Sequence, residues 1–269
     1  MDKLFFIYQP ILNEMDLVRR KLEKKANEFN SINLNYLEGF LKNHGKLIRP
    51  ALILLSSKSI SKENVEIDRI VNLCVSVELI HCASLIHDDV IDGDLQRRGA
   101  PTINFLFGEK GSVILGDILF IEAINILVNF PKEIIYSILN ATKNMCIGVI
   151  GEIKNENNKE YVKINANKTA SFFASCCECG AILSMADREI VNKFSKYGYY
   201  FGIIYQILDD ILDREITKIS FSYVRDIAGK AKEMLGSIND SIYKKKLIEL
   251  VDFVECEIEK NGKYCFSNR

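Results

Sequence analysis

The sequence has almost no net charge, which sets limits on its partners. Its 35 Lys and Arg residues are balanced by 36 Asp and Glu residues, for a formal net charge of −1. A nucleic-acid-binding protein usually shows a basic excess, so nucleic acid is not an expected partner. We find no apolar run long enough to span a bilayer, and "LFFI" near the start is too short for a secretory leader. We therefore expect a cytoplasmic chain that is not membrane-spanning.

Proline is also scarce, with four residues in the chain and none after Pro131. Because proline breaks the interior of a helix, the second half can form long helices. Strict alternation of apolar and polar residues, typical of strands, is rare, whereas apolar residues recur at helical intervals in 71–85, 114–127, 134–150, 169–185, 197–212 and 244–260. The sequence predicts an all-α bundle of long helices in one domain over 1–269, with breaks near 58–64, 93–101, 108–111, 129–132 and 153–167.

The eight cysteines show no regular framework, which favours reduced thiols over disulfides. The "CCEC" stretch at Cys176–Cys179 resembles part of a thiolate metal site, but no second cluster stands at ligand spacing. Small-residue packing in a core is the simpler interpretation. Glu78 and His81 have the spacing of half a di-iron site, and neither of the other two histidines supplies the second half.

Aspartate, by contrast, is concentrated in two motifs of identical spacing. "DDVID" runs from Asp88 to Asp92 and "DDILD" from Asp209 to Asp213, and each ends an apolar helical run. Residues i and i+4 lie on one face of a helix, so the first and third acids of each motif should share a face. Acid runs are usually solvated surface, but two copies of one spacing after apolar helices favour a functional origin.

Carboxylates this close repel one another unless a cation neutralises them. Oxygen-only ligands favour hard ions, and Mg²⁺ in particular takes one or two carboxylates together with substrate phosphates. Two such motifs facing each other across a cavity could hold several Mg²⁺ ions and a diphosphate between them. The sequence therefore predicts a magnesium–diphosphate site.

At this point the chain resembles the trans-isoprenyl diphosphate synthases, or polyprenyl synthetases. The resembling segments are "HGKLIRP", "ELIHCASLIHDDVID" with "RRGAPTIN", "ILGDILF", "NKTASFFASCCECGA" and "YQILDDILD", and the match covers roughly Gly45 to Asp213. The resemblance implies helices around a deep cavity, several Mg²⁺ ions per active site, and usually a homodimer. It implies head-to-tail condensation of isopentenyl diphosphate with an allylic diphosphate, releasing diphosphate.

The resemblance also implies roles for individual residues. Binding of isopentenyl diphosphate would fall to Lys46, Arg49, His81 and Arg98. Contacts to the allylic diphosphate would come from Arg97, Lys168, Thr169 and Gln206. The metal ligands would be Asp88, Asp89, Asp92, Asp209 and Asp213. The catalytic set would be Asp88, Asp92, Lys168 and Asp209.

Residue chemistry alone leaves several of these assignments open. Lys46 and Arg49 precede Pro50 at a favourable position for a first helical turn, and could simply be exposed. A lone histidine on an apolar helix, such as His81, is typical of a core. Arg97 lies close in sequence to a carboxylate cluster, which favours pairing with an acid or an anion.

Two features bear on activity and on product length. After "DDILD" the chain reads "REITKISFSYVRDIAGKAKEML", which looks shortened where the family usually has Gly-Lys and Gly-Lys-x-Thr stretches. This departure leaves open a low-activity or non-catalytic subunit of a prenyl synthase complex. A class I terpene cyclase is disfavoured, because its second motif is typically built on Asn, Ser or Thr, and Glu.

Small residues at Ser84 and Ala83 favour a deep pocket and a product longer than farnesyl, with a floor near Ile80, Val77 or Phe120.

Overall fold

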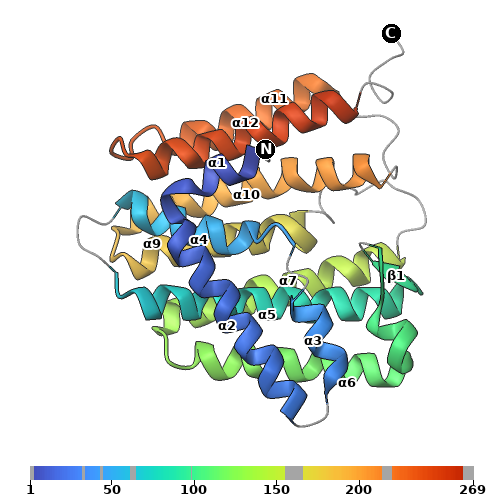
Figure 1. Cartoon of the computed structure of the whole chain (residues 1–269). Coiled ribbons are helices and arrows are strands. Elements are labelled where there is room, and N and C mark those ends of the chain that lie inside the picture. Colours follow the sequence, from blue (N-terminus) through green and yellow to red (C-terminus); the bar gives the residue numbers. More distant parts are fainter. Residues whose placement is uncertain are drawn as a thin grey trace. The chain divides into compact units, whose positions relative to one another are not determined.

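The computed structural model describes residues 3–31, 34–42, 45–60, 65–97, 99–154, 166–213 and 220–262, and helices dominate them (Figure 1). The chain begins with α1 (Lys3–Tyr8), a 3-10 turn η1 (Gln9–Ile11), α2 (Leu12–Ser31), α3 (Asn35–Lys42) and α4 (Ile48–Ile60). The described strands, β1 (Gln96–Arg97) and β2 (Ala100–Pro101), pair antiparallel, with Arg97 opposite Ala100. The all-α prediction is confirmed.

The chain forms two compact units that alternate along the sequence. Unit 1 comprises Met1–Ile11, Leu52–Val65 and Lys132–Arg269, and unit 2 comprises Leu12–Ala51 and Glu66–Pro131. The boundary between Ala51 and Leu52 falls inside α4. Because each unit is assembled from separate segments, neither is a simple N-terminal or C-terminal half. One domain over 1–269 stays a prediction.

Unit 2 is organised around α5 (Ile67–Ile91), which packs on α6 (Ile103–Leu127) and on α2 (Figure 1). Every residue of α5 from Leu73 to Ile80 is buried. This agrees with the nearly uninterrupted apolar sequence, since a helix that is apolar on most faces belongs in a core. Gly108 has φ +76° inside α6 and kinks it, at the break predicted for 108–111.

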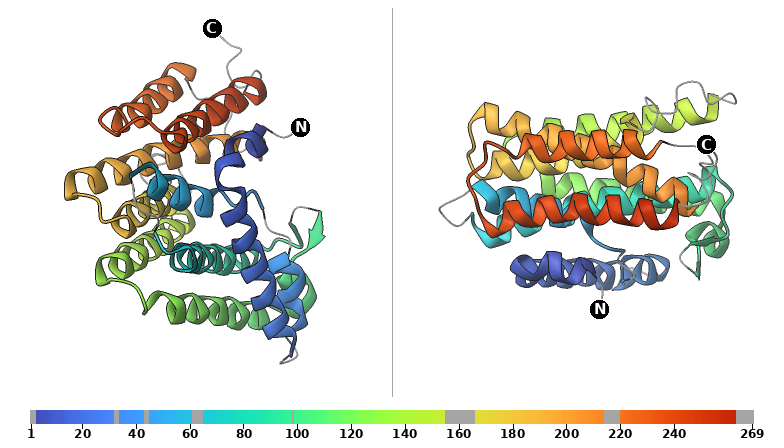
Figure 2. Two further views of the ribbon diagram at one scale, coloured as in Figure 1. Left: turned by 60° about the vertical axis from the view of Figure 1, so that its left-hand side comes forward. Right: turned by 90° about the horizontal axis from the view of Figure 1, so that it is seen from above.

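Unit 1 contains α7 (Lys132–Lys154), a π-helical turn η2 (Ala166–Ala170), α9 (Ser171–Leu183), α10 (Arg188–Leu212), α11 (Phe221–Met234) and α12 (Ile242–Asn261). Helices α9 and α10 lie in close contact, and α11 and α12 run alongside each other (Figure 2). A Cβ added to Gly198 of α10 would lie 2.4 Å from the carbonyl oxygen of Phe173. The missing side chain is therefore what lets α10 approach α9.

The helical predictions are confirmed. Five of the predicted segments lie within α5, α6, α7, α10 and α12, and the segment 169–185 covers all of α9 and extends two residues beyond each of its ends. Helices α1, α2, α3 and α11 were not predicted, and for α4 only the first turn at Pro50 was indicated. The predicted break at 129–132 separates α6 from α7, while the polar 155–165 stretch and residues 214–219 after the second motif lie outside the described residues.

One expectation about membranes needs correction. By length and composition alone, α5 and α7 are long and apolar enough to cross a membrane, contrary to the expectation that no apolar run has that length. In α5, 67% of the most apolar 18-residue stretch is buried inside the protein, as in the core helix of a soluble protein. In α7, 28% of the corresponding stretch is buried. Two such helices are weak evidence for a membrane location, so a chain that does not span a membrane stays a prediction.

Candidate active site

The first aspartate motif lies at the C-terminal end of α5. The helix ends at Ile91, Asp92 is its C-cap, and Gly93 follows with φ +70°. The backbone N–H of Asp94 donates to the carbonyl oxygen of Asp89 at 2.9 Å, which is the bond that closes a Schellman-type helix end. Carbonyl groups at a helix C-terminus carry partial negative charge and favour a nearby cation. The chain thus places the carboxylates where the backbone already favours a positive ion.

The three acids of this motif differ in burial. Asp88 is half-buried and Asp92 is exposed, whereas the side chain of Asp89 is 0% exposed. This follows from helix geometry, because a residue one position after Asp88 is rotated by about 100° around the axis, away from the face that Asp88 and Asp92 share. The outer acids are accessible to an ion and the middle acid is not on their face.

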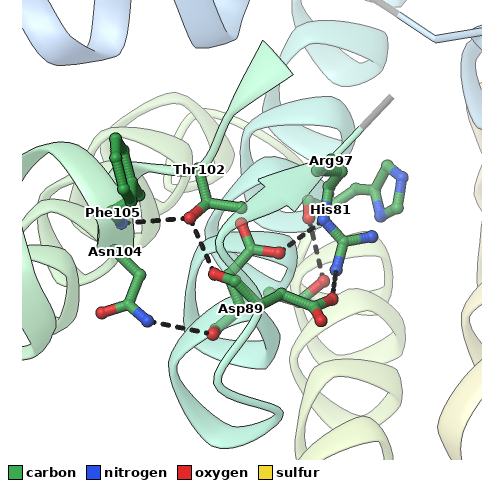
Figure 3. A network of polar contacts seen from close by, with 8 residues as sticks. His81, Asp89, Arg97, Thr102, Asn104 and Phe105 are labelled. Carbon is green, nitrogen blue, oxygen red and sulfur yellow. Dashed lines mark hydrogen bonds and ion pairs between the residues drawn. The ribbon is translucent and has the colours of Figure 1, made fainter. Parts of the chain in front are cut away.

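Arg97 of β1 makes the main polar contact of the buried acid. Its Nε donates to Asp89 Oδ1 at 2.5 Å, and its Nη2 lies 3.6 Å from Asp94 Oδ2 (Figure 3). Burial raises the pKa of the Asp89 carboxyl, and the hydrogen bond and charge of Arg97 oppose that shift. Asp89 Oδ2 is buried and finds no hydrogen-bond partner within the described residues. The sequence left open an acid or an anion as the partner of Arg97, and the structure shows an acid. Its contact with the allylic diphosphate stays a prediction.

Two residues without a predicted role, Thr102 and Asn104, hydrogen-bond the backbone of Asp94 and Asp89 close to this ion pair. Thr102 is the N-cap of α6: its Oγ1 accepts from the Phe105 N–H at 3.1 Å and donates to the carbonyl oxygen of Asp94 at 2.8 Å (Figure 3). Asn104 Nδ2 donates to the carbonyl oxygen of Asp89 at 3.3 Å. A threonine before an apolar helical run is a helix-start signal that could have identified Thr102.

The second motif repeats this arrangement at the end of α10. Asp209 is half-buried, Asp213 is exposed and caps the helix, and Asp210 is only 3% exposed. The N–H of Asp213 donates to the carbonyl oxygen of Asp209 at 2.9 Å. Asp210 had no predicted role, although a residue one position after Asp209 must lie on a different face of the helix.

Near the second motif, Gln206 joins two polar groups. Its Nε2 donates to Asp210 Oδ1 at 2.6 Å, and its Oε1 accepts from Thr169 Oγ1 at 2.5 Å. Lys168, the neighbour of Thr169 on η2, forms an ion pair with Glu152 Oε2 of α7 at 2.7 Å. Since that pair is partly exposed, its net contribution is small and an anion could compete for the lysine. The structure thus brings Thr169 and Gln206 together.

The remaining predicted residues lie in unit 2. Lys46 is exposed just before α4, and Arg49 is half-buried in its first turn. His81 is half-buried on α5, two turns before Asp88 and hence on a similar face. Arg98 lies outside the described residues. The predicted site residues therefore form one set in unit 2 and another in unit 1, and the facing of the two aspartate motifs stays a prediction.

The residues present fit magnesium that arrives with a diphosphate. Within the described part of the chain, no three His, Cys, Asp or Glu side chains converge as a metal site. Each motif instead offers two accessible carboxylates at a helix C-terminus. Mg²⁺ is usually held by one or two carboxylates plus substrate phosphates and water, so this donor set suits it. The outer aspartates Asp88, Asp92, Asp209 and Asp213 are the residues that would hold the ions.

A helical fold with two such motifs defines the class of isoprenoid synthases, and comparisons with known proteins place the chain within it. A family model for the polyprenyl synthetases matches residues 31–227. The chain is 34% identical over 219 residues to a prenyl transferase of Cyanophora paradoxa, covering 79% of this chain and 68% of that protein. The chain belongs to the polyprenyl synthetase family, which makes it a prenyltransferase by family.

Two further relatives differ in how much of their length this chain matches. The chain is 30% identical over 248 residues to the geranylfarnesyl diphosphate synthase of Methanosarcina mazei, covering 81% of this chain and 83% of that protein. It is 34% identical over 217 residues to heptaprenyl diphosphate synthase component 2 of Bacillus subtilis, covering 78% of this chain. In that case the match spans only 62% of the relative's length.

A solved structure supports the fold over nearly the whole chain. The polyprenyl synthase of Caulobacter crescentus CB15, complexed with calcium and isoprenyl diphosphate, superposes with a TM-score of 0.84 at 22% identity. The superposition covers 94% of this chain and 97% of that one. At this identity the likeness concerns the fold.

Proposed function

We propose that the chain condenses isopentenyl diphosphate with an allylic diphosphate head to tail, releases diphosphate and forms a linear prenyl diphosphate longer than farnesyl. The observation that carries the proposal is the repeated motif: each copy ends a helix with two accessible acids and one buried acid. Family membership supports the reaction class, and the accessible acids support a site for magnesium-bound diphosphate.

The residues divide the chemistry between them. Diphosphate leaves only when its charge is neutralised. Mg²⁺ held by the outer aspartates would supply that neutralisation. Arg97, Lys168 and Gln206 would orient the allylic diphosphate. Lys46 and Arg49 would hold isopentenyl diphosphate so that its double bond reaches the allylic carbon. Apolar walls would exclude water from the allylic cation, and the departing diphosphate is the base for the final proton loss.

The residues of α5 just before Asp88 favour a long product. Ala83 and Ser84 lie five and four residues before Asp88; Ala83 is buried, and Ser84 Oγ donates to the carbonyl oxygen of His81 at 2.9 Å. Small side chains one turn before the metal-binding acid leave room for a growing chain. Relatives named geranylfarnesyl and heptaprenyl diphosphate synthase are consistent with products beyond farnesyl.

The proposal is tested by product analysis. Purified protein is incubated with labelled isopentenyl diphosphate, Mg²⁺ and each short allylic diphosphate, and the extracted products are sized. Linear chains longer than farnesyl are expected. Ser84→Phe should shorten them by one or more five-carbon units, whereas Ser84→Thr, which keeps a small hydroxyl residue, should not. Cyclic hydrocarbons would instead indicate a terpene cyclase.

A second candidate is a subunit that needs a partner for activity. It is favoured by the relative named component 2 of a heptaprenyl synthase and by the shortened sequence after the second motif. Against it, both motifs keep all three aspartates, and without a metal such acids only destabilise the fold. If the chain forms a homodimer that turns over alone, the first candidate holds. Turnover that appears only when a partner protein is added would establish the second.

A further inference from the structure

The middle aspartate of each motif is buried, and binding of a metal by the motif does not explain why. Asp89 and Asp210 are 0% and 3% exposed, although each stands between acids that reach the surface. A buried carboxylate is unfavourable unless a partner compensates it. Each of them makes a compensating contact with a side chain that the proposed function assigns to diphosphate binding.

In the first motif the partner is Arg97. Its Nε donates to Asp89 Oδ1 at 2.5 Å, so the carboxylate fixes the guanidinium at its Nε side (Figure 3). The backbone of Asp89 is fixed as well, because its carbonyl oxygen accepts from the Asp94 N–H at 2.9 Å and from Asn104 Nδ2 at 3.3 Å. A guanidinium has five N–H donors, and these contacts of Arg97 use Nε and Nη2. The Nη1 side is the part best suited to a phosphate oxygen.

In the second motif Gln206 is a partner of Asp210. Its Nε2 donates to Asp210 Oδ1 at 2.6 Å, which leaves the second Nε2 hydrogen for another acceptor. Its Oε1 accepts from Thr169 Oγ1 at 2.5 Å, so the amide orientation is set from both ends. A carboxylate accepts but does not donate when ionised, and Asp210 therefore obliges Gln206 to present its amide nitrogen toward it.

We propose that the second aspartate of each motif is a positioning residue, with Asp89 holding Arg97 and Asp210 holding Gln206 for the allylic diphosphate, while the outer aspartates bind the metal. The inference rests on the proposed function and refines it. It replaces the metal-ligand role that the family resemblance implied for Asp89. To reach an ion on the face of Asp88 and Asp92, Asp89 would have to leave Arg97 and rotate out of the core.

The test separates binding of diphosphate from binding of magnesium. Wild type, Asp89→Ala, Arg97→Gln and the double variant are titrated with inorganic diphosphate at saturating Mg²⁺ by calorimetry. The half-saturating Mg²⁺ concentration for turnover is measured in parallel, with Asp92→Ala as the metal-ligand reference. Hydrogen bonds to charged groups imply that Asp89→Ala and Arg97→Gln each weaken diphosphate binding about 10- to 100-fold. The Mg²⁺ requirement of both should stay near wild type.

The double variant shows whether Asp89 acts through Arg97. If it does, removing Asp89 in the Arg97→Gln background should change diphosphate affinity by less than about twofold. Asp89→Asn, which keeps an oxygen acceptor, should recover part of the loss seen in Asp89→Ala. A rise in the Mg²⁺ requirement of Asp89→Ala comparable to that of Asp92→Ala would overturn the proposal, as would a further large loss in the double variant.

Two additional measurements keep the outcome interpretable. In the ligand-free protein, the Arg97 Nε–H proton should exchange with solvent faster in Asp89→Asn than in wild type, which NMR detects without substrate. This measurement tests the contact between Asp89 and Arg97 even if the wild type makes no prenyl product. Failure of the proposed function can therefore be told apart from failure of this inference. Should Asp89→Ala not fold, Arg97→Lys with intact Asp89 must still lose diphosphate affinity at an unchanged Mg²⁺ requirement, and unchanged affinity would refute the role of Arg97.

Discussion

At the scale of single residues, Asp88 provides the most direct test of the metal site. It is half-buried on the face of α5 that it shares with Asp92. Asp88→Ala should reduce turnover by at least about 10³-fold, in the range seen when charge stabilisation of a leaving group is lost. Circular dichroism should remain close to wild type, because the residue is near the end of its helix. Turnover near the wild-type rate at ordinary Mg²⁺ concentrations would show that the carboxylate is not an essential ligand.

The cysteines make a second prediction at this scale. Burial raises the pKa of the Cys177 and Cys179 thiols to about 12, so both stay protonated at neutral and mildly alkaline pH. Because the thiolate is the reactive form, iodoacetamide at a pH of about 8.5 should leave them unmodified until the protein is unfolded. Cys146 is exposed and provides the reference. Mass spectrometry of peptides from the native protein checks this, and early alkylation of Cys177 would show that α9 opens to solvent.

At the scale of elements, the close packing of α10 against α9 and η2 depends on two glycines one turn apart in α10. A Cβ at Gly198 would lie 2.4 Å from the Phe173 carbonyl oxygen, and one at Gly202 would lie 2.6 Å from the Ala170 Cα. These obstacles are backbone atoms, so the helices would have to separate. Gly198→Ala should lower the free energy of unfolding by about 1–3 kcal/mol, which is usual for overpacking.

A matched control is available in α11. Gly229 has nothing within 4 Å of its added Cβ. Gly229→Ala should therefore raise the free energy of unfolding by about 0.5–1 kcal/mol, since alanine is the better helix former. Urea denaturation of the three proteins measures both effects. Equal stability of wild type and Gly198→Ala would mean that the helices can move apart without loss.

The same elements show which helices the sequence could predict. Helices α5 and α10 were predictable because apolar residues recur along them and the aspartate motifs mark their ends. Helix α11 was missed because half of its buried positions hold alanine, which gives only a weak apolar signal. Its contacts with α10 and α12 bury Val224, Ile227, Ala228 and Ala231. These positions stand at the helical spacing i, i+3, i+4 and i+7, so the pattern was present in the sequence but faint.

The sequence predicted the acids of the candidate site, but it did not predict the side chains that contact them. The spacing of Asp88 and Asp92 indicated that they share a face, because that follows from the geometry of one helix. The ion pair of Asp89 with Arg97 depends instead on the turn after α5 and on the pairing of β1 with β2. Such a contact joins two elements, so spacing along the chain does not specify it.

At the scale of the whole molecule, ligand binding should appear as a change in thermal stability. A ligand that binds only the folded state stabilises it by RT ln(1 + [L]/Kd), or about 2.7 kcal/mol at about 100 times Kd. Since the outer acids and the diphosphate are both anionic, inorganic diphosphate should raise the melting temperature only when Mg²⁺ is present. Differential scanning calorimetry with and without a chelator measures this. An equal rise in the presence of the chelator would contradict a metal-bridged site.

The exposed face of α6 bears on assembly. Ile114, Ile121 and Val128 stand seven residues apart on this helix and at its end, and are 59%, 57% and 62% exposed in the isolated chain. Such a stripe of large apolar side chains is costly in water and suits an interface with another chain. In a twofold dimer the same residue occurs on both sides of the contact, so one substitution acts twice.

Ile121→Glu is the substitution that tests this face. It would place one carboxylate from each chain in an apolar interface, and their desolvation should raise the dissociation constant of the dimer by at least about tenfold. Sedimentation velocity measures the change, and Met185→Glu, at a site that is 89% exposed outside the helices, controls for the added charge. A dimer of unchanged strength in Ile121→Glu would exclude this face of α6 from the interface, and a monomeric wild type would remove the basis for expecting a homodimer.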